Sequence, residues 1–216
     1  MSISLVQYIA IAIIPVLFAI VIHEVAHGWV ANYLGDPTAR MLGRLSINPF
    51  KHVDLIGTVI VPVLMLSLGG FLFGWAKPVP IDSRNFRNPA RDMIWVALAG
   101  PVSNLIMALL WMVLLKVNLA FFAAEQYFYV PLRYMAEMGV QINIVLMVLN
   151  ILPIPPLDGA KVLIGLLPNS AARKLSRLEP YGFFIVLALV YFGIFSMLLQ
   201  PVFALFNVLA TTLLRM

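Results

Sequence analysis

Two histidines four residues apart, His23 and His27, enclose the segment HEVAH near the end of a long apolar run. In an α-helix, residues at i and i+4 lie on one face about one turn apart, so both imidazoles can reach a single metal ion. Glu24 is rotated off that face but stays close, where it can take a proton from a metal-bound water without being a ligand. The spacing therefore predicts a metal site with a neighbouring base. The alternative is a hydrogen-bonded pair of histidines in a helix core.

Composition places this helix in a membrane. Of the 216 residues, 62% are hydrophobic and 11% are charged, which is too little charge to cover a soluble domain of this size. An ionisable residue inside a membrane segment costs about 2.5–3.5 kcal/mol on insertion scales, which favours a metal-binding role for HEVAH. The absence of cysteine excludes disulfides and thiolate ligands. The net charge of +5 lies in loops between apolar runs, as is typical of membrane topology, so it does not indicate nucleic-acid binding.

A catalytic zinc usually has three protein ligands and a water, so two histidines leave one ligand to find. The candidates are His52, Asp54 and Asp158. Asp158 ends the stretch NILPIPPLD, in which three prolines forbid a regular helix. An unwound backbone at membrane depth is tolerated where it is buried in protein or lines a cavity, which suits a carboxylate facing a polar interior. The other interpretation of Asp158 is an ordinary N-cap or turn aspartate.

The apolar runs predict an all-α polytopic membrane protein, with residues 1–216 forming a single membrane-embedded domain. We expect about four to six membrane helices, including a possible re-entrant segment, because one span needs ~20 apolar residues. The runs cover residues 3–34, 55–73, 93–117, 140–152 and 183–214. Pro201 is expected to kink or break the last run. The proline-rich stretch Phe73–Ile81 is extended in character and predicts a short β-like segment at the membrane surface.

Three loops rich in lysine and arginine, at residues 36–54, 77–91 and 161–177, favour the cytoplasmic side for all three. If the first two loops share a side, residues 55–73 must re-enter the bilayer or lie in its interface. If that run does cross, one basic loop is translocated. The expected localisation is an integral, multi-pass membrane protein, in the cell membrane if the organism is prokaryotic.

Three motifs, taken in order, resemble the site-2 protease family of intramembrane zinc metalloproteases. They are HEVAH at 23–27, AGPVSN at 99–104 and NILPIPPLDG at 150–159. The family signature N-x-x-P-x-P-x-x-D-G is matched at each of its positions by the last motif. The motifs bracket about residues 20–165, and the chain resembles the compact members that lack PDZ and CBS modules.

This resemblance implies one zinc ion per chain, held by His23, His27 and Asp158, with Glu24 as the general base on a zinc-bound water. It implies a hydrolase that cuts peptide bonds within or near transmembrane helices of substrate proteins. The expected partners are such a transmembrane-helix protein and the lipid bilayer, and no nucleic acid. A substrate helix would have to unwind, because its carbonyls are bonded within the helix. Its extended stretch could then pair with a strand edge at Phe73–Ile81.

Asn104 and Asn150 are further candidates near the metal, since a buried amide can bind a substrate carbonyl or steady the tetrahedral oxyanion. Asn104 equally fits a helix contact built on small neighbours such as Gly100. Asn150 equally fits a role in satisfying carbonyls freed by the prolines. His52 and Asp54 are expected to be solvated loop residues outside the metal shell; the alternative is that they touch the site or gate the entry of water.

Two other functions use the same residues. A membrane metal-binding or transport protein would keep the ligands but would not need Glu24. A non-cleaving scaffold would bind membrane proteins without cutting them, and the intact HExxH motif argues against it.

Overall fold

The computed structural model describes residues 5–52, 54, 57, 60, 77–122 and 127–213. Its long helices are α1 (Leu5–Tyr33), α4 (Pro89–Phe121), α5 (Tyr129–Ile151) and α9 (Ile194–Leu213). The shorter ones are α2 (Thr38–Met41), η1 (Pro49–Lys51), η3 (Ser83–Asn85), α6 (Asp158–Leu166), α7 (Asn169–Ser176), η4 (Glu179–Tyr181) and α8 (Gly182–Tyr191). The described part of the chain is therefore helical, as predicted, and no strand occurs within those ranges.

Four helical segments in the described ranges are long and apolar enough to cross a membrane. They are Ala10–Tyr33, Pro89–Phe121, Tyr129–Ile151 and Ile194–Thr212. Large apolar side chains on these segments point outward, among them Ile13, Phe18, Ile106, Leu110 and Met197. So many exposed large apolar side chains are rare on soluble proteins and are suited to lipid.

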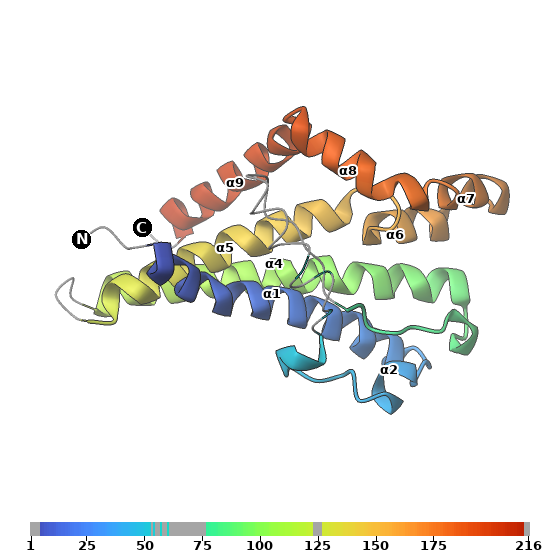
Figure 1. Cartoon of the computed structure of the whole chain (residues 1–216), viewed down its shortest axis with the longest axis horizontal. Helices are drawn as coiled ribbons and strands as arrows, with labels where there is room; N and C mark the ends of the chain where they lie inside the picture. Colours follow the sequence, from blue (N-terminus) through green and yellow to red (C-terminus); the bar gives the residue numbers. More distant parts are fainter. Residues whose placement is uncertain are drawn as a thin grey trace.

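Helices α1, α4 and α5 pack together and form the core of the bundle (Figure 1). α4 runs antiparallel to α1, because His27 of α1 bonds to Val96 while Asn104, farther along α4, bonds to Ala19. It also runs antiparallel to α5, because Asn104 bonds to Asn143 while Asn118 bonds to the earlier Tyr129. Small residues permit this close packing: Ala19 and Ala108 are fully buried. Without a hydrophobic driving force between helices in lipid, such small-residue contacts are the usual means of membrane helix association.

The polar connections gather at one end of the bundle. The chain leaves α1, enters α4 and leaves α5 at this end, and α6 and α7 lie there as well (Figure 1). The described parts of the three basic loops are therefore attached at this end of the bundle, and their cytoplasmic location stays a prediction. Most of residues 55–73 lies outside the described residues, so the re-entrant segment stays a prediction.

The β-like segment is wrong for its described part, residues 77–81, which contains no strand. Pro78 and Pro80 have no N–H to give to a ladder. The Lys77 N–H donates to the His52 carbonyl, and the Val79 N–H donates to the Glu24 side chain. These two N–H groups therefore donate to a loop carbonyl and a helix side chain of the chain itself, and not to a neighbouring strand. Residues 73–76 lie outside the described residues.

Two expected boundaries differ from the structure. α5 begins at Tyr129, well before residue 140, and carries Arg133 and Glu137 as an ion pair of 2.8 Å one turn apart. Mutual pairing lets both charges stay on the helix. The break in the last apolar run falls at Gly193, whose φ of 74° ends α8, whereas Pro201 lies inside α9. The left-handed backbone of Gly193 stops the helix more completely than a missing N–H does.

Candidate metal centre

His23, His27 and Asp158 converge on one point. The Nε2 atoms of the two histidines lie 3.0 Å apart, and each lies 3.1 Å from Oδ2 of Asp158. All three side chains are buried. The structure thus brings together two motifs that are separated by more than a hundred residues of sequence.

The hydrogen bond made by Nδ1 of each imidazole fixes which ring nitrogen carries the proton. The Nδ1 of His23 donates to Oδ1 of Asn104 at 2.6 Å, and the Nδ1 of His27 donates to the Val96 carbonyl at 2.7 Å. The orientation of the Asn104 amide follows from its Nδ2, which donates to the Ala19 carbonyl at 3.2 Å. Since both acceptors are oxygens without protons, each neutral ring has a bare lone pair at Nε2.

Three electron-rich atoms therefore face one another. Oδ2 of Asp158 is buried and has no hydrogen-bond partner among the described residues. A buried carboxylate oxygen opposite two lone pairs is repulsive unless a cation lies between them. Tetrahedral zinc at ~2.0–2.1 Å from its ligands would set those ligand atoms ~3.3–3.4 Å apart, which is close to the observed spacing. The donor set and its geometry fit a zinc ion.

Gly100 of α4 leaves space for the His23 and His27 imidazoles. A Cβ atom placed there would lie 2.5 Å from Cε1 of His23 and 2.5 Å from Nε2 of His27. Real Cβ atoms are essentially never that close to other heavy atoms. Any larger residue would push the imidazoles apart, so the AGPVSN motif gives the centre room as well as a hydrogen-bond acceptor.

Asp158 reaches the centre from the break between α5 and α6. The break ends α5 at Ile151, and Asp158 is the first residue of α6. Gly159 lies against the end of α5, where a Cβ would be 2.0 Å from the Ile151 carbonyl oxygen. Leu157 is the N-cap residue of α6, so Asp158 does not have the N-cap position of the alternative interpretation. The Asp158 side chain faces the histidines instead, and its other oxygen, Oδ1, accepts from Nζ of Lys161 at 2.9 Å.

Glu24 is half-buried beside the centre. Its Oε2 accepts a hydrogen bond of 2.8 Å from the Val79 N–H, and Val79 is itself buried. Gly28 permits this contact, because a Cβ there would lie 2.8 Å from Cγ1 of Val79. The segment at residues 77–81 thus sits on the face of α1 that carries Glu24.

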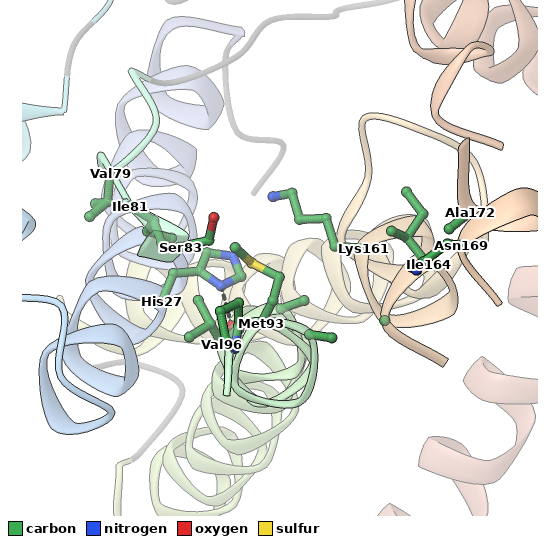
Figure 2. A pocket seen from close by; sticks show the side chains of 14 residues that line it. His27, Val79, Ile81, Ser83, Met93, Val96, Lys161, Ile164, Asn169 and Ala172 are labelled. Atoms are coloured by element: carbon green, nitrogen blue, oxygen red, sulfur yellow. Dashed lines mark hydrogen bonds between the residues drawn. The ribbon is translucent and has the colours of Figure 1, made fainter. Parts of the chain in front are cut away.

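The centre lies inside a spanning segment. At ~1.5 Å per helical residue, His27 is about 9 Å and His23 about 15 Å from Tyr33, where α1 ends. A cavity of about 580 Å³ adjoins it and extends between α4 and the α6–α7 pair. Figure 2 shows His27 on one wall, Val79 and Ile81 above it, and Ile164, Asn169 and Ala172 on the opposite wall. The cavity therefore connects the buried histidine to the polar end of the bundle.

The structure places the remaining predicted residues as follows. Asn104 is fully buried behind His23, and it also donates to Asn143 at 2.9 Å. Asn150 donates to the Leu146 carbonyl of its own helix at 3.0 Å. His52 is not solvated as expected: it is 2% exposed, and its Nε2 donates to the Ser46 carbonyl. Asp54 is half-buried and accepts from the Gly57 N–H.

Sequence reasoning missed Lys161, Gly100 as a spacer, and Asn143. Lys161 lies at i+3 from Asp158 on one helix face, and that spacing was a usable signal. Gly100 and Asn143 had none, because their roles depend on how α4 and α5 approach α1.

Comparison with known proteins gives consistent results. The sequence profile of peptidase family M50 matches residues 121–193. The candidate zinc metalloprotease YwhC of Bacillus subtilis is 38% identical over 199 residues, which cover 92% of this chain and 86% of that protein. The candidate zinc metalloprotease Rip2 of Mycolicibacterium smegmatis is 30% identical over 188 residues, covering 85% of this chain and 69% of that protein. No solved structure shows significant similarity.

Proposed function

Because this chain belongs to peptidase family M50, we propose that it is an intramembrane zinc metalloprotease that hydrolyses peptide bonds within or near transmembrane helices of other proteins. The observation that carries the proposal is the convergence of three bare ligand atoms inside a spanning helix bundle. A site of hydrolysis at that depth meets substrates that are themselves in the membrane. The chain acts as a single domain, with the bilayer as its solvent.

His23, His27 and Asp158 would hold a zinc ion, which would supply the electrophile needed to polarise a scissile carbonyl and to activate water. Glu24 acts as the general base: it accepts a proton from that water and later passes it to the leaving amine. Its carboxylate follows His23 directly in the helix, so the base and the metal ligands move as one unit. The hydrogen bond from Val79 holds one oxygen of Glu24, which leaves the other for proton transfer.

The cavity next to His27 provides a route for water and for an extended substrate segment. Its walls are mainly apolar, with Met93, Val96 and Ile164 beside the polar groups of Lys161 and Asn169. A helical substrate cannot offer a free carbonyl, so the substrate must unwind before it enters. Apolar walls suit the side chains of an unwound membrane segment. The segment at residues 77–81 borders this route, with Val79 and Ile81 on its wall.

Exchanging Glu24 for glutamine tests the proposal. Glu24→Gln keeps the shape of the side chain and removes the base, so we expect about one zinc per chain and a loss of cleavage of at least ~100-fold. Zinc is measured by mass spectrometry of the detergent-purified protein, and cleavage by the fragments of a single-helix membrane substrate in liposomes. Asp158→Ala, run alongside, is expected to lose both zinc and cleavage.

The two measurements separate the competing functions. A wild type that holds zinc but cuts no membrane substrate, and whose Glu24→Gln variant behaves identically, is a metal-binding or transport protein. Zinc retained in Asp158→Ala would show that the third ligand lies elsewhere.

A further inference from the structure

Lys161 contacts the metal centre from the cavity side. Its Nζ donates to Oδ1 of Asp158 at 2.9 Å, and its side chain is 46% exposed. In Figure 2 it extends from α6 across the cavity towards the wall that carries His27. Of the described residues that line this cavity, Lys161 alone carries a full formal charge. A cation is thus placed on the outer oxygen of a metal-ligand carboxylate.

The two oxygens of the Asp158 carboxylate face different groups. Oδ2 lies 3.1 Å from each histidine Nε2, and Oδ1 is bound to Lys161. A carboxylate can bind a metal through one oxygen or through both. While Oδ1 is held by an ammonium group, only Oδ2 is available to the metal.

We infer that Lys161 is a positioning residue that keeps Asp158 a one-oxygen ligand and so preserves an open coordination position on the cavity side. A catalytic zinc site needs that open position for water and for the substrate carbonyl. The hydrogen bond to Lys161 also fixes the rotation of the carboxylate, as outer partners of metal ligands commonly do. The predicted effect of Lys161 on cleavage rests on the proposed protease function, whereas its predicted effect on metal coordination does not.

The geometry also sets the expected effect on metal binding. Lys161 is not a ligand, and removing one cation does not disfavour a second cation close by. Lys161→Met should therefore keep the metal. Its Asp158, freed at Oδ1, should bind through both oxygens. With solvent still bound, this crowds the open position and raises the coordination number from four to five.

Cobalt substitution makes this change visible, since zinc itself is spectroscopically silent. We would load the metal-free protein with Co²⁺ and record its visible absorption, which is strong for four-coordinate and weaker for five-coordinate sites. The variants are Lys161→Met and Lys161→Gln, with Lys161→Arg as the conservative replacement. The control is Lys174→Met, the same change at an exposed lysine of α7 outside the cavity.

We expect about one Co²⁺ per chain in every variant. The visible band should weaken in Lys161→Met and Lys161→Gln and keep its wild-type intensity in Lys161→Arg and Lys174→Met. With zinc, the kcat for the membrane substrate should fall about 10–100-fold in the first two variants only.

Three outcomes would overturn the inference: an unchanged band in both neutral variants, loss of the metal from them, or an equal change in Lys161→Arg. A wild type that binds Co²⁺ but cuts no substrate would sink the proposed protease function. The spectral comparison would still decide the role of Lys161.

Discussion

The backbone N–H of Val79 donates to the carboxylate of Glu24 at 2.8 Å, although 55 residues separate the two in sequence. This bond fixes the proposed base from outside its own helix. It also uses a donor that sequence reasoning had assigned to substrate pairing. The segment at residues 77–81 is therefore part of the site itself.

Val79→Pro removes this donor and should weaken cleavage. A hydrogen bond to a charged group contributes about 1.5–3 kcal/mol, so we expect a fall in kcat of roughly 10–100-fold with zinc content unchanged. Val79→Ala is the control, because it shortens the side chain but keeps the N–H. Equal rates in the two variants would show that the bond has no part in catalysis.

Gly100→Ala should displace metal. The added methyl group would lie 2.5 Å from atoms of both His23 and His27, so the two rings cannot keep their spacing. We expect most of the zinc to be lost from the purified protein. Gly139→Ala is a matched control, since its Cβ would lie 2.3 Å from the Trp111 ring, far along the bundle. That variant should lose stability and keep its zinc; a Gly100→Ala protein with full zinc would contradict the geometry.

Asn104→Ala should lower zinc affinity about 10–100-fold, the usual effect of removing the hydrogen-bond partner of a metal-bound histidine. Without the acceptor, the His23 ring is free to rotate or change tautomer. A chelator titration measures the affinity. Asn118→Ala alters another fully buried asparagine of α4, whose Nδ2 faces the Tyr129 carbonyl, and should leave the affinity unchanged. The same loss in both variants would mean that only helix packing was disturbed.

Asp36 should make the protein sensitive to acid. Burial alone would raise the pKa of its carboxyl, but hydrogen bonds from Thr38, Asn85 and the Asp82 N–H lower the pKa below its usual value of 3.8. Its stabilising contribution is then fully present above the unfolded pKa and is lost as pH falls through the folded one. We expect the Tm in detergent to decline below about pH 5, where the unfolded carboxyl begins to bind protons.

Asp36→Asn tests this. The variant should have a lower Tm at neutral pH and a smaller further decline in acid. Asp82→Asn is the comparison: the pKa of Asp82 is lowered to about 2 by Arg84, but the pair is exposed and solvent screens it. A wild-type acid response in Asp36→Asn would assign the sensitivity to other groups.

Local patterns predicted much of the fold. The runs of apolar residues in α1 and α4 are long enough to require a membrane, and that is a property of composition alone. The start of α5 was harder to predict from the sequence, because Arg133 and Glu137 are typical of a loop. In the structure they pair with each other on the helix. The stop at Gly193 was missed because Pro201 is the stronger signal in the sequence, although it lies within α9.

The sequence by itself determined that the two candidate ligands and the proposed base lie together: His23, Glu24 and His27 are close in any helix, since their spacing follows from the helical repeat. It also marked Asp158, through a motif that resembles a known family. Only the tertiary structure decided that Asn104, Gly100, Val79 and Lys161 surround these residues. Their contacts join α1 to α4, to the loop at 77–81 and to the cavity, and such contacts depend on how helices pack, which no local spacing encodes.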